Sequence, residues 1–412
     1  MSFLSVRTLW IISVRTAFNI SNAWYKTSEK RYNIMKFICS KMILNNIVNV
    51  VQKSIGTKNV HPILECIKLE ARADNTVTFT TNSVDVCIEY TSAIEVDEPG
   101  TAALPAKIFG EIVRRLPEGD ITVCVDMTNY VTDIECGRSK FTIQSMNPEE
   151  FPAPQAVSED YKAELKQREL KQIIRKVTPF ISQSESRKPV LMGALFDFRG
   201  DTLNVVGSDL HRLAVIKTKV ENNTVDNKFV VPGITLGKIA QLLSDEEDAV
   251  VNIVVSKNNI LFDFGEYRFY SRLLEGEFIK YDIIISAPNP IKVRSEKQAI
   301  INSLERANLI INDDFSSKTD NKLPVRLNIN LGKIDISCKT GKGCVNDTVE
   351  VEHDGGDITI GFNCRFILDA LNACDQDTVL MEFSAPKSGC FIKPEDGSDS
   401  YTFMVLPVKL YN

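Results

Sequence analysis

Residues 44–51 read Leu-Asn-Asn-Ile-Val-Asn-Val-Val, with apolar side chains at the first, fourth, fifth and eighth positions. This spacing puts four apolar side chains on one face of an α-helix. The same spacing returns at 170–177 (Leu-Lys-Gln-Ile-Ile-Arg-Lys-Val) and, with one serine, at 300–307 (Ile-Ile-Asn-Ser-Leu-Glu-Arg-Ala). The three segments start 126 and 130 residues apart. The sequence therefore predicts three equivalent helices in tandem copies of one unit.

A second helical pattern follows the first in each copy, and its three starts lie 127 and 128 residues apart. These segments are 109–116, 236–243 and 364–371. After each one, apolar and polar residues alternate as in a half-buried strand, at 121–125, 251–255 and 379–383. Each copy then ends in a hairpin with the return strand at 141–146, 269–274 or 401–406. We therefore expect an α+β fold of three tandem domains, each with two helices on a curved antiparallel sheet.

The repeat places domain boundaries at 35–156, 160–287 and 288–412, each of ordinary domain size. Residues 1–34 do not follow the repeat, and their apolar run Trp10-Ile11-Ile12 is too short to span a bilayer. We expect 1–34 to be a disordered upstream extension, with Met35 as the natural start. A processed targeting segment is the alternative, although 1–34 has no clear signal-peptide cleavage site.

Charge is distributed unevenly along the chain, whose net charge is −6. The six predicted helices contain 14 Lys/Arg and 6 Asp/Glu, which leaves +8 on the helices and −14 elsewhere. They are counted here as 41–55, 107–116, 164–178, 235–244, 296–308 and 363–373. A basic helical face on an acidic protein is typical of polyanion binding. The alternative is an ordinary solvated face, because Lys and Arg are good helix formers.

The composition, 43% hydrophobic and 25% charged, is that of a soluble globular protein. The ten cysteines include no Cys-x-x-Cys pair, and the three histidines have no metal-ligand spacing. We therefore expect reduced thiols, a cytoplasmic protein, and no metal, cofactor or membrane partner. An enzyme is the alternative, but Thr340-Gly341-Lys342-Gly343 is only a fragment of a phosphate loop. Asp209 and His211, two apart on a predicted strand, would point to the same face, but no nucleophile pattern accompanies them. The sequence thus predicts a protein without catalytic activity.

Short segments along the whole repeat resemble, in the same order, those of the bacterial DNA polymerase III beta subunit family, the sliding clamps. The segments that carry the resemblance are Met35-Lys36-Phe37, His61-Pro62-Ile63-Leu64, Leu104-Pro105-Ala106-Lys107, Arg115–Gly119, Gly193-Ala194-Leu195-Phe196, Ser208–Val215, Gly361-Phe362-Asn363, Leu368–Ala373 and Leu406–Leu410. The resemblance implies DNA-clamp domains and a head-to-tail homodimeric ring whose helices line a hole for double-stranded DNA. It also implies partners: the polymerase III catalytic subunit, the clamp loader and other proteins with clamp-binding motifs. A repeat scaffold that binds only proteins is the alternative.

For DNA, the resemblance singles out Lys58, Lys107 and Asn363. The charge pattern of the helix 164–178 adds four residues, Arg168, Lys171, Arg175 and Lys176. Contacts of such side chains with phosphates are independent of base sequence. Each of these lysines and arginines could equally be an ordinary solvated side chain.

For partner proteins, the resemblance implies an apolar cleft between the middle and last domains that takes the Leu/Phe end of a peptide. Its lining would be Leu191, Ser208, Leu210, His211, Arg212, Leu213, Ile279, Ile283, Ile284, Phe366, Met404, Leu406, Pro407 and Val408, with Lys387 and Gly389 at the edge. The segment 211–213 could instead be plain strand packing. Leu210 stands where many relatives have glycine, Phe366 where tyrosine is frequent, and Ile279 and Ile283 where proline and a charged residue are frequent. The cleft should therefore be more apolar than is usual in the family.

The ring interface would use Ile108, Ile112 and Phe141 of the first domain against Leu309 and Ile310 of the last. First-against-last contacts between two copies close a two-fold ring. Ile112 fits the core of its own domain equally well.

Overall fold

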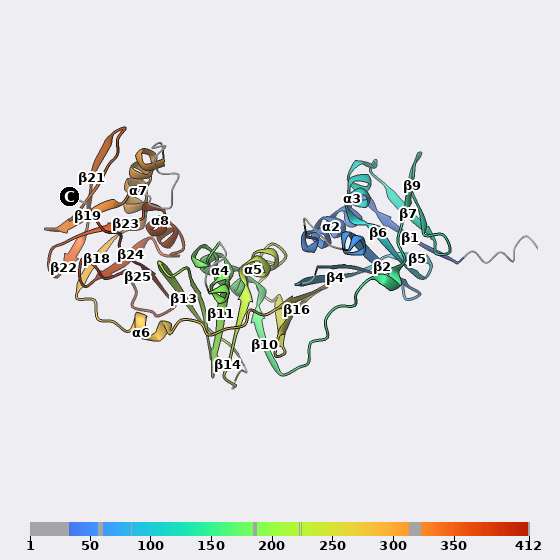
Figure 1. Cartoon of the computed structure of the whole chain (residues 1–412), viewed down its shortest axis with the longest axis horizontal. Coiled ribbons are helices and arrows are strands. Elements are labelled where there is room, and N and C mark those ends of the chain that lie inside the picture. The colour runs from blue at the N-terminus through green and yellow to red at the C-terminus, as the bar shows by residue number, and fades with distance from the viewer. Residues whose placement is uncertain are drawn as a thin grey trace, which may run out of the picture. The chain divides into compact units, whose positions relative to one another are not determined.

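The structure, a computed structural model, describes residues 33–56, 61–83, 85–183, 188–221, 223, 225–312 and 323–410 (Figure 1). The chain divides into two compact units, one ending at Pro154 and the other beginning at Gln155. Of the predicted extension 1–34, residues 1–32 lie outside the described residues. Ile34 is already the first residue of strand β1, one residue earlier than the sequence suggested.

The first unit contains one copy of the repeat. In chain order its elements are β1 (Ile34–Ser40), α2 (Lys41–Val51), β2 (Cys66–Arg72), β3 (Thr76–Asn82), β4 (Val86–Ala93), β5 (Glu95–Glu98), β6 (Gly100–Pro105), α3 (Ala106–Arg115), β7 (Asp120–Asp126), β8 (Val131–Cys136) and β9 (Ser139–Gln144). Short 3-10 turns lie at Gln52–Ser54, Pro62–Glu65 and Pro148–Glu150. The described strands form one sheet in the order β5-β1-β7-β8-β9, and the other four pair in the order β4-β3-β2-β6.

The second unit contains two further copies. The middle copy consists of β10 (Tyr161–Lys166), α4 (Gln167–Val177), β11 (Gly193–Arg199), β12 (Thr202–Ser208), β13 (Arg212–Lys219), β14 (Asn227–Pro232), α5 (Gly233–Ile239), β15 (Val250–Val255), β16 (Asn259–Phe264) and β17 (Tyr267–Arg272), with 3-10 turns at Thr178–Phe180 and Pro189–Met192. The short helix α6 (Tyr281–Ile285) lies in the connector to the last copy. The last copy consists of β18 (Ile291–Glu296), α7 (Lys297–Asn312), β19 (Val325–Asn330), β20 (Lys333–Lys339), β21 (Cys344–Glu350), β22 (Glu352–Asp354), β23 (Ile358–Phe362), α8 (Cys364–Asn372), β24 (Thr378–Phe383), β25 (Cys390–Pro394) and β26 (Tyr401–Val405).

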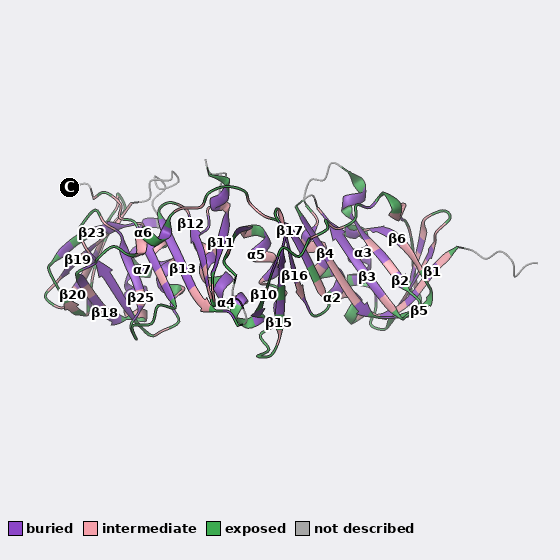
Figure 2. Cartoon of the chain, turned by 90° about the horizontal axis from the view of Figure 1, so that it is seen from below, coloured by how far each residue is buried: buried purple, intermediate pink, exposed green. Residues whose placement is uncertain are grey.

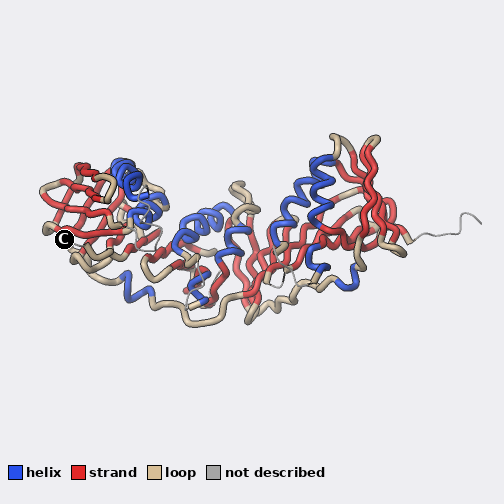
Figure 3. Tube along the Cα trace, turned by 45° about the horizontal axis from the view of Figure 1, so that its top comes forward, coloured by secondary structure: helices blue, strands red, loops and turns tan. Residues whose placement is uncertain are grey.

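The three copies share one topology, so the predicted threefold repeat is confirmed. In each, the first strand pairs antiparallel with the strand that follows the second helix: β1 with β7, β10 with β15, and β18 with β24. In each, the two helices contact one another, α2 with α3, α4 with α5, and α7 with α8 (Figure 3). The predicted hairpins are β8–β9, β16–β17 and β25–β26.

The predicted apolar helix stripes are the buried faces of the helices. Leu44, Ile47, Val48 and Val51 are at most 2% exposed, and even the serine of the third stripe, Ser303, is fully buried. Burying such a face is what stabilises a short helix in a protein. One helix is shorter than predicted, because α5 ends at Ile239 rather than near Leu243. It contains two glycines, which are poor helix formers, although Leu243 remains buried beyond its end.

The middle and last copies share one continuous sheet. Strand β13 pairs antiparallel with β26, from Arg212 opposite Val405 to Ile216 opposite Tyr401. The described strands of this sheet run in the order β14-β11-β12-β13-β26-β25-β24-β18-β22. Strands near this junction, such as β13, are largely buried (Figure 2). This shared sheet explains why the second unit holds two copies as one compact body.

Candidate functional site

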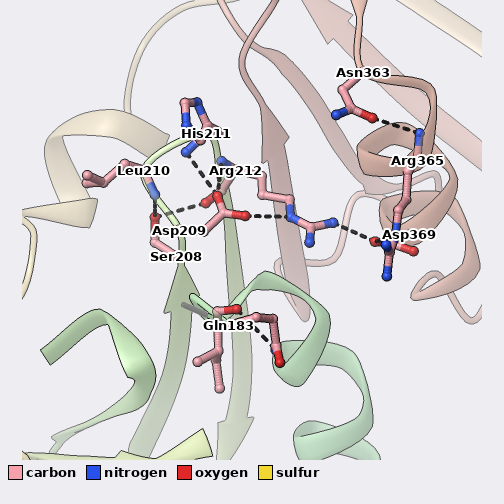
Figure 4. A network of polar contacts seen from close by, with 10 residues as sticks. Gln183, Ser208, Asp209, Leu210, His211, Arg212, Asn363, Arg365 and Asp369 are labelled. Atoms are coloured by element: carbon pink, nitrogen blue, oxygen red, sulfur yellow. Dashed lines mark hydrogen bonds and ion pairs between the residues drawn. The ribbon is translucent and has the colours of Figure 1, made fainter. Parts of the chain in front are cut away.

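The candidate partner cleft is built around the turn between β12 and β13 (Figure 4). The Asp209 carboxylate accepts hydrogen bonds from the backbone N–H groups of His211 (2.9 Å) and Arg212 (3.0 Å). The Ser208 hydroxyl donates to the Arg212 carbonyl (2.9 Å) and accepts from the Leu210 N–H (3.2 Å). Asp209 and His211 therefore lie in a tight turn. Placing them two apart on a strand, as in the enzyme alternative, is wrong.

Arg212 ties the middle copy to the last one. Its Nε donates to Asp209 (2.9 Å) and its Nη1 donates to Asp369 on α8 (2.6 Å), 157 residues away. The guanidinium lies 4.2 Å from the centre of the Phe366 ring, within range of a cation–π interaction. Arg212 is only 6% exposed, so its charge is buried but paired on two sides. Such a fork of hydrogen bonds fixes the geometry of both partners.

An apolar cluster lies at this junction. Leu191, Leu213 and Met404 are buried members of it, and Ile279 and Ile284 pack against it partly buried. All five were expected in the cleft. Because Leu191 and Leu213 are fully buried, they form the support under the cleft rather than its open surface.

The open surface is supplied by the exposed apolar residues of the predicted set. Leu210 is 50% exposed, Ile283 72% and Leu406 38%. The Leu406 N–H donates to the His211 carbonyl (2.8 Å), which fixes the C-terminal segment beside the turn. Exposed large apolar side chains of this kind are typical of a binding surface.

The remaining predicted residues surround these. The His211 ring is exposed and lies 6.4 Å from the ring of Phe366. Pro407 and Val408 are half-buried, and the Val408 N–H donates to the Gly361 carbonyl (2.8 Å). Lys387 is exposed, whereas Gly389 is buried behind the Met404 side chain.

A polar network missed by the sequence analysis holds the connector that carries Ile279, Ile283 and Ile284. The fully buried Asp197 accepts from the Arg199 guanidinium (2.5 Å) and from the Tyr281 hydroxyl (2.6 Å). Arg199 also donates to both carboxylate oxygens of Asp282 (3.0 and 2.8 Å), and this hydrogen bonding lowers the pKa of Asp282. Because Tyr281 and Asp282 begin α6, the network fastens one wall of the cleft to β11.

A pocket of about 840 Å³ beside the connector was not predicted from the sequence. It shares Ile279 and Ile283 with the predicted cleft and is otherwise lined mainly by the middle copy, including Lys228, Phe229 and Leu274. No local pattern signals such a pocket, because its walls come from strands and a connector far apart in the sequence.

The predicted DNA residues on α4 fall into two classes. Arg168 and Arg175 are exposed. Lys171 donates to Asp245 (2.5 Å), and this hydrogen bond lowers the pKa of the Asp245 carboxyl. Lys176 is paired with Asp375 of the last copy. Counting Lys171 and Lys176 as free positive charges therefore needs correction, because each already has a carboxylate partner.

The other predicted DNA residues lie on separate helices. Lys107 is exposed in the first turn of α3. The Asn363 side chain caps α8, since its oxygen accepts from the Arg365 N–H (3.1 Å), a structural role that the sequence analysis did not assign. Lys58 lies outside the described residues.

Among the predicted interface residues, Ile108 (47% exposed), Phe141 (41%) and Leu309 (72%) are open to a partner, and Ile310 is half-buried. Ile112 is only 5% exposed, so the structure favours its alternative role in the core of its own domain.

In the described part of the chain, no group of three or more His, Cys, Asp or Glu side chains is placed to hold a metal ion, and none of the helices could span a bilayer. All ten cysteines are free, most of them buried, and burial raises the pKa of thiols such as Cys39, to about 11. The segment 340–343 is a hairpin turn, closed by the Thr340 N–H on the Gly343 carbonyl (2.8 Å).

Comparison with known proteins identifies the three copies. Residues 35–155, 164–280 and 285–409 match the N-terminal, central and C-terminal domains of the DNA polymerase III beta subunit. The chain is 31% identical to the beta sliding clamp of Halalkalibacterium halodurans over 390 residues, which cover 92% of this chain and all of that one.

Solved structures agree with the sequence relatives. The DNA polymerase sliding clamp of Bacillus subtilis superposes with a TM-score of 0.85 at 26% identity, covering 92% of this chain and all of that one. The beta subunit from the DNA polymerase of Streptococcus pyogenes gives 0.84 at 28% identity, with 91% of this chain and all of that one covered. The chain belongs to the DNA polymerase III beta subunit family, the beta sliding clamps.

Proposed function

We propose that this chain, a DNA sliding clamp, closes with a second copy into a ring that encircles duplex DNA and tethers the replicative polymerase. The observation that carries the proposal is the threefold repeat of one fold, which matches sliding clamps over their whole length. A ring holds DNA by topology, so it needs no base contacts and can slide. Its benefit to a polymerase is a high effective concentration at the template, not chemistry.

The DNA surface would be the basic helical face. Exposed Lys107, Arg168 and Arg175 would be its cations, and Asn363 would approach DNA from the N-cap position of α8. Contacts of this kind attract phosphates and weaken as salt rises. The net charge of −14 outside the helices would discourage DNA from binding elsewhere.

Ring closure would bring Ile108 and Phe141 of one copy against Leu309 and Ile310 of the other. Three of the four are exposed large apolar side chains, which a partner surface would cover. Two such contacts related by a two-fold axis close a dimer.

The cleft at the junction of the middle and last copies would bind the polymerase III catalytic subunit, the clamp loader and other proteins with clamp-binding motifs. Its occupant is a peptide with an apolar Leu/Phe end, because the exposed rim residues Leu210, Ile283 and Leu406 are all apolar. Buried apolar anchors usually supply most of the affinity of such peptides.

We also propose how the chain is divided into domains and where it works. The domains would be 35–156, 160–287 and 288–412, the protein would act without catalysing a reaction, and it would work in the cytoplasm beside the DNA. The alternative, a scaffold that binds only proteins, shares the repeat but requires no retention on DNA.

The test is retention on DNA of two shapes. The purified chain is loaded with a clamp loader and ATP onto a nicked circular plasmid, which is then isolated by gel filtration with and without cutting at one restriction site. We expect the clamp to stay on circles and to leave cut DNA from its ends. Leu309→Glu, which should open the ring, serves as the control and should not be retained on circles. Equal retention on circular and linear DNA, or none on either, would contradict the proposal.

A further inference from the structure

The loop that follows the second helix of each copy is fastened to the start of the first helix by the same backbone hydrogen bond. The three pairs, donor first, are Lys41–Gly119 (2.9 Å), Gln167–Ala249 (2.8 Å) and Lys297–Asp377 (2.7 Å). These loops are 116–119, 240–249 and 373–377, and they contain one, four and two acidic residues. The fold therefore holds each acidic loop beside the first helix of its own copy.

The middle copy combines the most acidic of these loops with the most basic helix. Helix α4 carries four cations and one carboxylate, a charge of +3 (4 − 1), which is the largest on any described helix. The loop carries four carboxylates in succession, a charge of −4, and all of them are exposed. They belong to Asp245, Glu246, Glu247 and Asp248. Opposite charges of similar size therefore lie side by side in this copy.

Gln167, the first residue of α4, fixes this loop at both ends. Its side-chain oxygen accepts a hydrogen bond from the Ser244 N–H (2.8 Å), and its side-chain nitrogen donates to the Val250 carbonyl (2.9 Å). The side chain is only 7% exposed. A buried polar group whose hydrogen bonds are all made keeps its partners in place. The acidic segment between Ser244 and Val250 is therefore held beside α4.

Asp245 shows how close this segment lies to the cations of α4. Its carboxylate accepts from the Lys171 ammonium (2.5 Å), and the Lys171 side chain is only 12% exposed. The hydrogen bond from Lys171 lowers the pKa of Asp245, and the charges of Arg175 and Arg168 lower it further. A carboxylate of the chain itself therefore already lies in the field of the two exposed arginines that were predicted to bind DNA.

The three carboxylates next to Asp245 remain uncompensated. In the part of the chain that the structure describes, Glu246, Glu247 and Asp248 form no ion pair. Their repulsion of an approaching phosphate extends about 8 Å at physiological ionic strength. We propose that residues 245–248 form an autoinhibitory contact, which competes with DNA phosphates for the cations of α4 and keeps the hold of this helix on DNA weak.

The inference rests on the proposed function of the basic helical face, and it adds a regulation of that face. A weak hold does not release a closed ring, since topology retains the ring on DNA. It does let the ring slide rapidly, because fewer phosphate contacts have to be broken at each step. The acidic segment therefore favours sliding over tight binding.

The experiment removes the three uncompensated carboxylates from the full chain and leaves the pair of Asp245 and Lys171 intact. The test variant is Glu246→Gln with Glu247→Gln and Asp248→Asn. The matched control is Glu352→Gln with Asp354→Asn and Asp357→Asn, which removes three exposed carboxylates on and after β22 of the last copy. One readout is the fluorescence anisotropy of a labelled duplex over a salt series. The other is single-molecule tracking of clamps loaded on DNA.

We expect the test variant to bind the duplex about fivefold more tightly at about 50 mM salt, because three repulsive charges near the phosphates are removed. The gain should shrink as salt rises and screens the carboxylates of the unaltered chain. Loaded clamps of the test variant should diffuse along DNA more slowly than those of the unaltered chain. The control variant should change the duplex affinity by less than about twofold, because its carboxylates lie away from α4.

If the control variant strengthens duplex binding as much as the test variant, net charge rather than the position of the loop is responsible, and the inference is wrong. It is also wrong if the unaltered chain is retained on circular DNA but the test variant has the same duplex affinity. Both of these results leave the proposed function standing. If the unaltered chain is not retained on circles, the proposed function fails, and the inference fails with it.

Discussion

At the cleft, Arg212 is 6% exposed and its guanidinium lies between two carboxylates and an aromatic ring, whereas on α4 the side chains of Arg168 and Arg175 are exposed. Both regions belong to the second unit, and both are centred on arginine. At the cleft the charge is a structural part that holds two copies of the repeat in register. On α4, under the proposed function, the exposed charge would attract phosphates of DNA without a fixed geometry. We therefore expect geometry to matter at the first region and the sum of charge at the second.

The largest effect is expected for Arg212→Ala. It leaves the carboxylates of Asp209 and Asp369 without their shared cation, and breaking a buried ion pair in this way lowers the free energy of unfolding by about 3–5 kcal/mol. Calorimetry should show the loss in the transition of the second unit, and polarisation should show loss of peptide binding. Arg212→Lys should lie in between, because lysine cannot form the same fork of hydrogen bonds.

Arg268→Ala is the control, since Arg268 is an exposed arginine of the same unit, 3.6 Å from Asp263. It should change stability by less than about 1 kcal/mol. An Arg212→Ala variant as stable as Arg268→Ala would mean that burial of an arginine does not decide how much it contributes to the free energy of unfolding.

On α4, replacing Arg168 and Arg175 together by glutamine should weaken binding to a labelled duplex and leave peptide affinity unchanged. The slope of log affinity against log salt should become shallower by about 2, because each lost phosphate contact contributes roughly 0.9. Fluorescence anisotropy over a salt series measures this. The control is the double variant Lys257→Gln with Lys280→Gln. It also removes two positive charges, but beside the pocket of the connector, and it should leave the salt slope unchanged.

The same contrast explains what the sequence could predict. The stripes at Leu44–Val51 and Leu170–Val177 depend on local spacing, so the helices and their buried faces were predicted correctly. The three-copy fold followed from the repetition of those stripes. The end of α5 was placed too late, because two glycines within it outweighed an apolar pattern that extends to Leu243.

Pairs formed across the fold left no signal in the sequence. Asp369 lies 157 residues from Arg212, and the sequence placed it on a predicted helix without indicating its partner. Charge counting identified α4 as basic but could not show that Asp245 and Asp375, 74 and 199 residues from their lysines, neutralise two of its cations. Which charges remain free is decided by tertiary structure.

Asp245 and Asp375 offer a second test of whether unpaired positive charge on α4 sets the affinity for duplex DNA. Asp245→Asn with Asp375→Asn should release Lys171 and Lys176 and strengthen duplex binding, with a salt slope steeper by about 1. The effect should be less than that of the arginine pair, because the lysine side chains are only 12% and 15% exposed. The control is the double variant Asp263→Asn with Asp282→Asn, which removes the same number of negative charges at positions outside α4. Equal strengthening by both pairs would show that net charge alone, and not release of the lysines, is responsible.

The smallest loss of stability is expected at another ion pair across the junction of the middle and last copies. Lys217 and Asp399 are paired much as Arg212 and Asp369 are, but their side chains are 39% and 79% exposed. An exposed pair gains little over its hydration and is screened by salt, so Asp399→Asn should lower the free energy of unfolding by less than about 1 kcal/mol. That small loss should vanish in calorimetry at high salt, whereas the loss in Arg212→Ala should persist. If Asp399→Asn is as damaging as Arg212→Ala, then position at the junction rather than burial sets the strength of these pairs.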